Sequence, residues 1–556
     1  MLTKITTLSR AIVILSATLA LPACGAEQSG PRNIIFVLVD DLRYDGMGFL
    51  QSELQTPNID ALAEEGVYFS NAVVTSSLCS PSRATILTGQ TTRNHGVVDN
   101  NDSSEEGLIF FPSYLQQAGY ETAFFGKWHM GDATDMPRPG FDRWVSFQGQ
   151  GAYFPTDFIP PALLEKGIVN QLNVDGTKVD QKGYITDELT DYAMQWLTED
   201  RDQSKPFFLY LSHKAVHSEA KPAPRHEGQY ADTEFKLPDS AEDTPENREG
   251  KPMWVQNQRN SWHGIDFFYA SDRKMTDYLK DYYGALSAVD ESLGRIMDYL
   301  KQNNLEQNTM IVFYSDNGFL IGDHGLIDKR NAYEGSVLVP MLVAAPGYLP
   351  EGVTNQARVR NLDLAPTFLE VAGVEEPQQF EGKSFLPVAS GDMDVATWGE
   401  PDFVYEYYWE WSFPMTPTTF AIERGPLKYI QYHGVWDIEE LYNLEEDPGE
   451  MHNLIKDPRY LNEIMTLRRA LYQQLETNGG QHIVPFHARL AEGVNLRDMN
   501  GATAAPFPDS WKVEPNRADK LNGLFPDTPL KQKYSEEGKT YFPYMESLNV
   551  DNADSN

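Results

Sequence analysis

Cys79 is the residue of this sequence that most needs a chemical explanation. It lies in segment 78–85 (LCSPSRAT), and the 556-residue chain has only one other cysteine, Cys24. Cys79 is either a group that does chemistry or a buried or exposed thiol of a loop. Segment 78–85 alone does not separate these interpretations, so the residues that converge on Cys79 decide between them.

Four oxygen-bearing side chains form the second chemical feature. Asp40 and Asp41 are adjacent in the chain, and Asp316 and Asn317 are adjacent in segment 315–318 (SDNG). Carboxylate and amide oxygens are hard ligands, which suit Ca²⁺ or Mg²⁺ better than zinc or copper. Three carboxylates that meet at one point need a cation, because like charges a few ångströms apart raise one another's pKa. The alternative is that both segments are polar turns after strands.

Strands that alternate with helices would position these residues. Continuous apolar runs predict buried strands, and apolar steps of three and four predict amphipathic helices. The predicted strands are 33–39, 122–125, 206–211, 310–314 and 339–344. The predicted helices are 57–66 with Thr56 as the cap, 82–87, 112–118 and 279–300. Such alternation predicts an α/β fold with a large, mixed, mostly parallel sheet between layers of helices.

Polar residues follow these strands at the point where each strand ends. In chain order they are Asp40, Asp41, Lys127, His129, His213, His217, Asp316 and Asn317. In open α/β sheets, ligands bind beyond the carboxyl ends of the strands. We therefore expect these side chains at one edge of the sheet.

Together these segments resemble the type I, formylglycine-dependent sulfatases of the alkaline-phosphatase superfamily. Segment 79–83 (CSPSR) resembles their Cys-x-Pro-x-Arg signature, and segment 126–131 (GKWHMG) resembles their Gly-Lys-Trp-His motif. Segment 315–318, then His324-Gly325, Lys329 and 333–336 (YEGS), resembles a second signature, with Gly335 where a glutamate is often found. The resemblance covers about residues 33–373, with a weaker match at 441–454.

The resemblance implies an alkaline-phosphatase-like fold and a sulfuric ester hydrolase. It implies that a maturation enzyme converts Cys79 to Cα-formylglycine. One hydroxyl of the hydrated aldehyde then attacks sulfur, and the other loses a proton as sulfate leaves. The implied metal ligands are Asp40, Asp41, Asp316, Asn317 and the modified Cys79. The implied ion is Ca²⁺, with Mg²⁺ less favoured.

The same resemblance assigns roles to cations and histidines. Arg83 would steady the hydrate and the oxygens on the metal side, and His129 would assist sulfate elimination. Lys127 and Lys329 would hold sulfate oxygens. His217 is the candidate general acid at the leaving group, with His213 as the alternative.

The overall charge restricts the partners. The chain carries 81 acidic against 45 basic residues, a formal net charge of −36, which argues against binding nucleic acid or anionic membrane surfaces. An anionic substrate must then be held by a local basic cluster or a metal. Strong acidity often accompanies life in salty water, and we interpret it as a sign of a marine bacterial source.

The N-terminus predicts export. Lys4 and Arg10 flank an apolar run at 11–21 that is too short to span a bilayer. The segment 21–25 (LPACG) resembles a bacterial lipobox with Cys24 as the lipidated residue, and cleavage with release is the alternative. We expect a protein of the periplasm or a lipoprotein anchored to the outer membrane, with secretion as the alternative. Its only contact with a membrane would be the lipid anchor.

Weaker signals concern the substrate. Arg225, His226 and His263 lie in a long insertion at 220–266, which could form one wall of a glycan cleft or be disordered. Trp409 lies in the aromatic segment 405–411 (YEYYWEW), which could stack on sugars, although such alternation is more typical of a core strand. We keep Arg225, His226 and Trp409, with His213, as substrate-binding candidates.

The predicted domain organisation has four parts: a signal segment at 1–24, a catalytic domain at 30–396, a C-terminal α+β subdomain at 397–478 and an extended tail at 479–556 packed on the enzyme. The subdomain rests on an antiparallel pair at 419–423 and 428–432 and a helix at 457–478.

The sequence therefore predicts an enzyme that removes O-sulfate from a sulfated carbohydrate. We expect a marine polysaccharide or its oligosaccharides, such as carrageenan or ulvan, and fucoidan and host glycosaminoglycans stay open as alternatives. The competing enzyme prediction is a formylglycine-type phosphodiesterase or phosphonate hydrolase. The competing prediction without enzyme activity is an inactive glycan-binding lipoprotein.

Overall fold

The structure is a computed structural model that describes residues 32–100, 107–130, 134–159, 161–266, 268–270, 273–410, 413–434 and 438–477. Cys24 and the predicted tail at 479–556 lie outside these residues. No helix within them combines the length and apolarity needed to cross a membrane.

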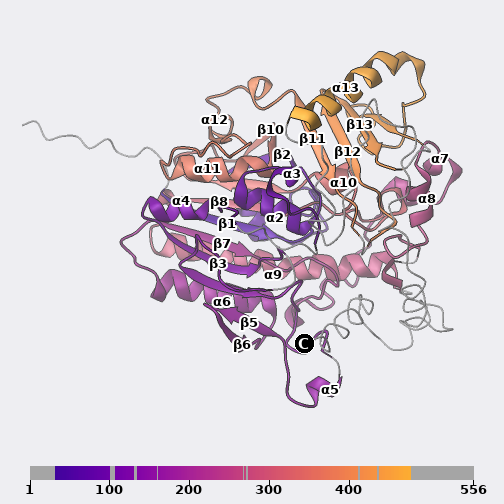
Figure 1. Cartoon of the computed structure of the whole chain (residues 1–556). Coiled ribbons are helices and arrows are strands. Elements are labelled where there is room, and N and C mark those ends of the chain that lie inside the picture. The colour runs from indigo at the N-terminus through magenta and orange to yellow at the C-terminus, as the bar shows by residue number, and fades with distance from the viewer. Residues whose placement is uncertain are drawn as a thin grey trace, which may run out of the picture.

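A ten-stranded sheet forms the centre of the molecule (Figure 1). Its strands are β1 (Asn33–Val39), β2 (Val67–Val73), β3 (Glu121–Lys127), β4 (Arg143–Phe147), β5 (Gln171–Val174), β6 (Thr177–Asp180), β7 (Phe207–Ser212), β8 (Thr309–Ser315), β9 (Met341–Ala344) and β10 (Val353–Arg360). Their order is β10-β2-β9-β8-β1-β7-β3-β4-β5-β6. The central strands β8, β1, β7, β3 and β4 are parallel, whereas β9, β5 and β6 pair antiparallel with their neighbours. The predicted mixed, mostly parallel sheet is confirmed.

Helices cover both faces of this sheet. The longer ones are α1 (Pro57–Glu64), α2 (Cys79–Thr88), α4 (Pro112–Gln117), α6 (Ile185–Gln195), α9 (Met275–Gln302) and α11 (Leu364–Val371); the four-residue helix α3 (Thr92–His95) follows α2. Side chains of α1, α6 and α9 pack with Ile35, Val37 and Val39 of β1. Side chains of α2, α4 and α11 pack with Ile34, Phe36 and Leu38 on the other face. Alternate residues of β1 thus enter two cores, which is why the strand is apolar throughout.

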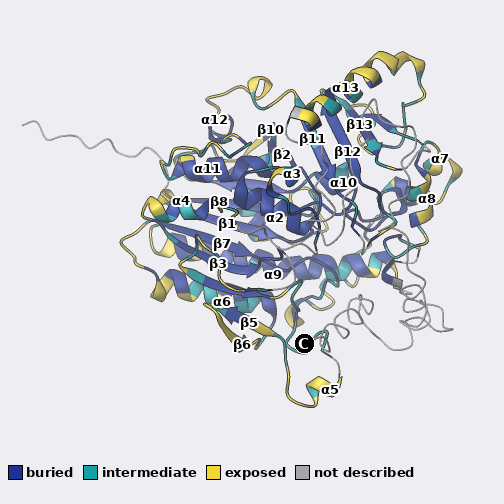
Figure 2. Cartoon of the chain, viewed as in Figure 1, coloured by how far each residue is buried: buried dark blue, intermediate teal, exposed yellow. Residues whose placement is uncertain are grey.

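A second, smaller sheet packs beside the first. It contains β11 (Asp402–Tyr407), β12 (Thr419–Arg424), β13 (Leu427–Tyr432) and β14 (Glu440–Asn443), all antiparallel, and α13 (Leu461–Thr477) packs on it. The predicted C-terminal antiparallel sheet with a helix is confirmed. Tyr405 and Tyr407 of β11 are buried, as the core-strand interpretation of that aromatic segment requires. Figure 2 shows the central strands and α2 as buried, while α5 (Pro161–Leu164) is exposed.

The starts of two predicted helices differ from the prediction in detail. Thr56 occupies the cap position of α1 but makes no side-chain bond to the helix; its hydroxyl accepts from Gly48 N and donates to Asp60 Oδ1. Helix α2 begins at Cys79, three residues earlier than predicted. Pro81 does not prevent this early start, because proline is tolerated in the first turn of a helix.

The insertion 220–266 is ordered throughout. It forms short helical turns, including Pro224–His226, Asp239–Ala241, α7 (Pro245–Arg248) and α8 (Met253–Gln258).

Candidate active site

The carboxyl end of β1 supplies two carboxylates. Asp40 and Asp41 are both buried, and Asp41 has a left-handed backbone (φ 61°). The turn is held by its backbone: the Asp41 N–H donates to Asp316 Oδ1 (3.1 Å), and the Tyr282 hydroxyl donates to Asp41 O (2.6 Å). This turn directs the two carboxylates to the same place.

The carboxyl end of β8, which pairs with β1, supplies Asp316 and Asn317. Carboxylate oxygens of Asp40, Asp41 and Asp316 lie within 4.8 Å of one another, and all three residues are buried. Asn317 Nδ2 donates to Asp41 Oδ1 (2.7 Å). The predicted convergence of these four residues at one edge of the sheet is confirmed, because the strands β1 and β8 are parallel neighbours.

The donor set of this cluster suits a divalent cation. Asn317 Oδ1 is buried and has no hydrogen-bond partner among the described residues, although such an acceptor is costly to leave unpaired. Its position beside three carboxylates gives a hard, all-oxygen ligand set. The cluster is therefore a candidate metal site on its own geometry.

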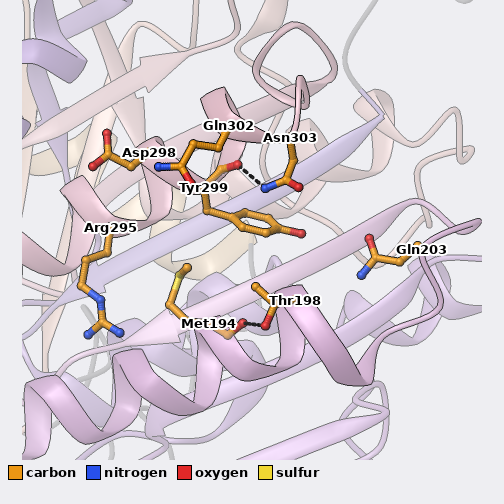
Figure 3. Close-up of a pocket in the computed structure, with 8 residues that line it drawn as sticks. All are labelled: Met194, Thr198, Gln203, Arg295, Asp298, Tyr299, Gln302 and Asn303. Atoms are coloured by element: carbon orange, nitrogen blue, oxygen red, sulfur yellow. Dashed lines mark hydrogen bonds between the residues drawn. The ribbon is translucent and has the colours of Figure 1, made fainter.

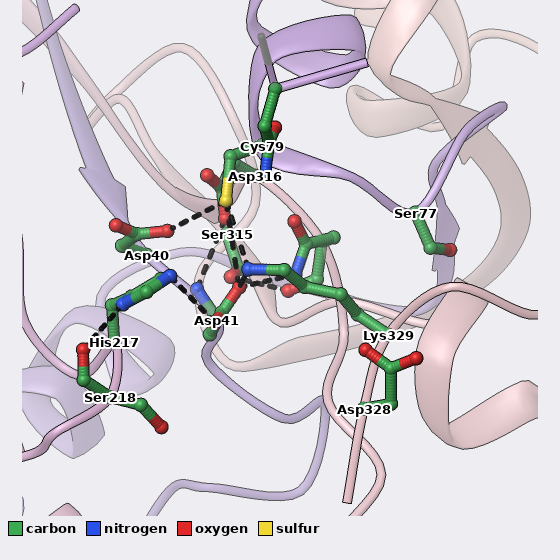
Figure 4. A network of polar contacts seen from close by, with 12 residues as sticks. Asp40, Asp41, Ser77, Cys79, His217, Ser218, Ser315, Asp316, Asp328 and Lys329 are labelled. Atoms are coloured by element: carbon green, nitrogen blue, oxygen red, sulfur yellow. Dashed lines mark hydrogen bonds and ion pairs between the residues drawn. The ribbon is translucent and has the colours of Figure 1, made fainter. Parts of the chain in front are cut away.

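Cys79 lies above this cluster in the first turn of α2. Its thiol is 3.4 Å from Asp40 Oδ1 and 3.9 Å from Asp41 Oδ1, and Lys329 Nζ donates to its sulfur at 2.9 Å (Figure 4). The Ser82 N–H donates to Leu78 O (2.9 Å) as the helix starts. Helix N-termini carry partial positive charge, so the start of α2 is one of the groups near Cys79 that attract negative charge.

Three cations surround the carboxylates. Lys127, at the end of β3, donates to Asp40 Oδ2, and Lys329 donates to Asp41 Oδ1. Arg83, one turn after Cys79, donates from Nε to Asp316 Oδ2 (2.9 Å), and its Nη2 lies 3.7 Å from Asp40 Oδ1. The local cationic cluster that the acidic composition demands is therefore present.

Two histidines border the cluster. His217 Nε2 lies 3.7 Å from Asp41 Oδ2, and its Nδ1 is 2.7 Å from the Ser218 carbonyl. His129 has a left-handed backbone (φ 49°), and its carbonyl and Nδ1 both lie near the Ser80 hydroxyl, next to Cys79. His213 is placed differently, because its Nε2 faces Ser292 of α9 at 3.3 Å.

Burial and neighbouring charges shift the pKa values of the groups in this cluster in different directions. Burial raises the pKa of Asp40, but Lys127, His217 and Arg83 bring it well below its usual range. Burial, reinforced by Asp40, raises the pKa of Asp316 to about 7. Burial and Asp40 raise the pKa of the Cys79 thiol to about 12. Burial and Lys127 lower the pKa of His129 and of His217 well below the usual value.

The remaining candidates have other contacts. Arg225 pairs with Asp187 of α6 and Glu291 of α9, and His226 Nε2 is 3.1 Å from Glu291. The Trp409 indole donates to Pro414 O (3.2 Å) in the loop after β11. These contacts tie the side chains to the scaffold and do not bring them to the carboxylate cluster.

A surface pocket elsewhere in the molecule carries none of this chemistry. It lies beside α6 and α9 and is lined by Met194, Thr198, Gln203, Arg295, Asp298, Tyr299, Gln302 and Asn303 (Figure 3). Arg295 is paired with Asp191 (2.7 Å). No residue predicted for the active site lines this pocket.

Sequence reasoning missed two hydroxyls that support the site. Ser212, the last residue of β7, accepts from Arg83 Nη1 (2.7 Å) and donates to Lys127 O (2.8 Å). Ser315, the last residue of β8, accepts from Leu42 N (2.9 Å). Each serine is the polar last residue of an otherwise apolar strand, and this pattern could have identified both from the sequence.

Comparison with known proteins agrees with this geometry. The sequence profile of the sulfatase family matches residues 32–374, more than half of the chain. The chain belongs to the sulfatase family. A further profile, the C-terminal region of N-sulphoglucosamine sulphohydrolase, matches residues 322–477 of this sulfatase.

Individual relatives cover most of this sulfatase. An N-acetylglucosamine-6-O-sulfatase from Bacteroides thetaiotaomicron is 33% identical over 525 residues, covering 83% of this chain and 90% of the relative. A solved structure in complex with its substrate D-glucosamine-2-N,6-O-disulfate has a TM-score of 0.72 and 30% identity, covering 81% of this chain and 98% of that one. A solved structure in complex with k-i-k-neocarrahexaose has a TM-score of 0.64 and 27% identity, covering 81% and 94%. The predicted sulfuric ester hydrolase is confirmed.

Proposed function

We propose that this sulfatase removes O-sulfate from a sulfated sugar with a formylglycine at position 79 and Ca²⁺ in the carboxylate cluster. The observation that carries the proposal is the place of Cys79. It lies in the first turn of α2, with its sulfur 2.9 Å from Lys329 Nζ and 3.4 Å from Asp40 Oδ1.

The thiol itself is a poor candidate for the nucleophile. Its pKa of about 12 keeps it protonated at neutral pH, because burial and Asp40 disfavour the thiolate. Conversion of Cys79 to Cα-formylglycine would supply a hydrated aldehyde as the attacking group. Lys329 and the start of α2 both face that group and would partly offset the effect of burial and Asp40 on negative charge there.

Asp40, Asp41, Asp316 and Asn317 would hold the metal. A bound Ca²⁺ would act as a Lewis acid and as a template for sulfate oxygens. Asp316, with a pKa near 7, would give up its proton on metal binding. Arg83 keeps Asp316 and Asp40 oriented toward the cluster.

The lysines and histidines of the site would bind sulfate and transfer protons. Lys127 and Lys329 would bind sulfate oxygens, and His129, beside Ser80, would assist elimination of sulfate. The Ser218 carbonyl accepts a hydrogen bond from His217 Nδ1–H, so Nε2 is the nitrogen left to face the leaving oxygen. Nε2 can donate a proton there only when His217 is an imidazolium, a form that burial and Lys127 disfavour and that the negative charge of a bound sulfate ester would favour. We keep His217 as the general acid over His213, whose Nε2 faces α9.

A 6-O-sulfated glucosamine is the favoured substrate. A relative named for N-acetylglucosamine-6-O-sulfatase activity and a structure bound to a glucosamine disulfate support it. A carrageenan oligosaccharide is the second candidate, supported by the structure bound to k-i-k-neocarrahexaose and by the marine interpretation of the acidic composition.

Sulfate release from both sugars, measured beside hydrolysis of a phosphodiester, tests the function. We expect release from the glucosamine sulfate by the wild type and none by Cys79→Ala. A clear preference for the phosphodiester would establish the competing phosphodiesterase or phosphonate hydrolase instead. Equal absence of turnover in both proteins, with peptide mass showing formylglycine in the wild type, would favour the inactive glycan-binding lipoprotein.

We also propose export with lipidation at Cys24, on the apolar run 11–21 and the lipobox-like segment. Cys24→Ser should then move the protein from the membrane fraction to the soluble one. Unchanged fractionation would favour cleavage and release.

A further inference from the structure

The segment that carries Lys329 is also anchored to the small sheet. Lys329 points to Cys79 and Asp41, while its neighbours Asp328 and Arg330 have other partners. Arg330 Nη1 donates to Asp328 Oδ1 (2.9 Å), and Arg330 Nε donates to Glu410 Oε1. Glu410 is fully buried and lies just after β11.

An aromatic ring from the connection between β11 and β12 reinforces this anchor. The Arg330 guanidinium lies 3.7 Å over the ring of Phe413, and His263 of the insertion stacks on the same ring (4.7 Å, 22°). His263 Nδ1 also lies 3.4 Å from Asp328 Oδ2. The insertion, the Lys329 segment and the connection between β11 and β12 therefore meet at one point.

This arrangement fixes the backbone on both sides of Lys329. Lys329 O accepts from Asn331 N (2.9 Å) and from the Ser336 hydroxyl, and Asp328 O accepts from Leu320 N (2.7 Å). A buried ion pair is weak evidence for stability, because burial of the charges offsets much of their attraction. Its value at this place is geometric, since a planar guanidinium held by two carboxylates cannot rotate freely.

We propose that Glu410 is a positioning residue, which acts through Arg330 to hold Lys329 over Cys79 and so lets the small sheet set the sulfate-binding geometry. This inference rests on the proposed role of Lys329 as a sulfate ligand. It gives the C-terminal sheet a function in the reaction, although the hydrogen bonds of Cys79 within the described residues go to Asp40, Asp41 and Lys329 and not to that sheet.

The test compares Glu410→Gln with Glu406→Gln. Glu406 is a matched control because it is also buried, lies on β11 and pairs with an arginine of the catalytic domain, Arg93 (2.7 Å). Both variants lose one buried charge pair, so we expect similar losses in melting temperature. Only Glu410→Gln should weaken inhibition by inorganic sulfate, roughly tenfold, with a matching fall in kcat/KM, because small displacements of a positioned group are costly. Equal effects of the two variants on sulfate inhibition would overturn the proposal.

A double-mutant cycle with Lys329→Met separates the inference from the proposed function. If Glu410 acts through Lys329, Glu410→Gln causes no further loss of sulfate affinity in the Lys329→Met background. Additive losses contradict positioning and leave the role of Lys329 intact. Unchanged sulfate affinity in Lys329→Met alone contradicts the role of Lys329 itself.

Discussion

Asp40 and Asp316 are buried carboxylates of one cluster, yet their pKa values shift in opposite directions. Burial raises both, but Lys127 donates to Asp40 and brings its pKa down, whereas the charge of Asp40 adds to the effect of burial on Asp316. The cluster therefore holds negative charge on one carboxylate and a proton on another near pH 7. Binding of a divalent cation would replace that proton. The contribution of each oxygen donor can therefore be tested by removing it and measuring the affinity for the metal.

Asn317 provides the most direct test of the metal site. Its Oδ1 is a buried acceptor beside the carboxylates and has no hydrogen-bond partner among the described residues, so Asn317→Leu should weaken Ca²⁺ binding about 10- to 100-fold. Isothermal titration of chelator-treated protein with Ca²⁺ measures the affinity. The control is Asn173→Leu, which removes an equally buried asparagine whose Oδ1 accepts from Gly176 N (2.7 Å). Equal affinity in Asn317→Leu and the control would show that Oδ1 is not a ligand.

His95 should make the free energy of unfolding sensitive to acid, at a place outside the candidate metal site. Burial lowers its pKa from 6.5 to about 3, and its ring bonds Thr85 (3.1 Å) and Val97 N (3.1 Å) in the neutral form. The unfolded chain binds this proton at a higher pH, so the contribution is complete above pH 6.5 and is lost as the pH falls toward 3.

The matching experiment uses His95→Asn and urea unfolding. At pH 8 the variant should be about 1–3 kcal/mol less stable than the wild type, through lost hydrogen bonds. By pH 5 that difference should shrink by about 2 kcal/mol, because only the wild type loses the histidine contribution. His452→Asn, at an exposed histidine, is the control and should show no such change. A difference that stays constant from pH 8 to pH 5 would contradict the prediction.

At the level of elements, the sequence predicts five of the ten strands of the large sheet, β1, β3, β7, β8 and β9, and misses the other five. Strands β1, β7 and β8 match their predicted ranges within one or two residues, because parallel strands buried on both faces are continuous apolar runs. Strand β10 alternates exposed and buried residues at the edge of the sheet, and β5 and β6 are four residues each, so neither gives a continuous run. These three strands are missing from the predicted set, as are β2 and β4, whose apolar residues are interrupted by polar ones.

The same reasoning explains which parts of the site were predictable. Asp40, Asp316, Lys127 and His217 follow strand ends, and the parallel sheet brings them together. The contact of Lys329 with Cys79 joins residues 250 positions apart and depends on the packing of loops, for which the residues alone give no rule. Only the resemblance to sulfatases pointed to Lys329.

Gly126 shows how closely β3 and β7 must approach to place Lys127. Its φ is 125°, and a Cβ at this position would lie 1.7 Å from Ser212 O. Gly126→Ala should therefore force the strands apart, cost about 3 kcal/mol or more and displace Lys127 and His129 together. Melting temperature and sulfate release measure the two effects.

Gly119→Ala is the control for Gly126→Ala. Gly119 also has a left-handed backbone (φ 88°), but nothing lies within 4 Å of the added Cβ. The Gly119→Ala variant should lose only the small amount of stability that a left-handed backbone costs alanine, and it should keep its activity. Comparable losses of activity in both variants would mean that backbone strain, and not strand separation, is responsible.

At the scale of the whole molecule, a strongly acidic enzyme must admit an anionic substrate. The net charge of −36 repels sulfated sugars at long range, whereas Lys127, Lys329 and Arg83 attract sulfate only within the buried site. Salt shortens the long-range repulsion, because the screening length falls from about 30 Å at 0.01 M to about 8 Å at 0.15 M. The site cations are buried and are screened much less.

Substrate capture should therefore improve as salt is added. We expect kcat/KM to rise by a few-fold between 0.01 and 0.15 M NaCl, and more steeply for a disulfated glucosamine than for a monosulfated one, since repulsion grows with substrate charge. The value of kcat at saturating substrate is the internal control and should stay constant, because the reaction takes place among buried groups. A kcat/KM that falls with salt would show instead that exposed cations near the entrance steer the substrate, despite the acidic surface.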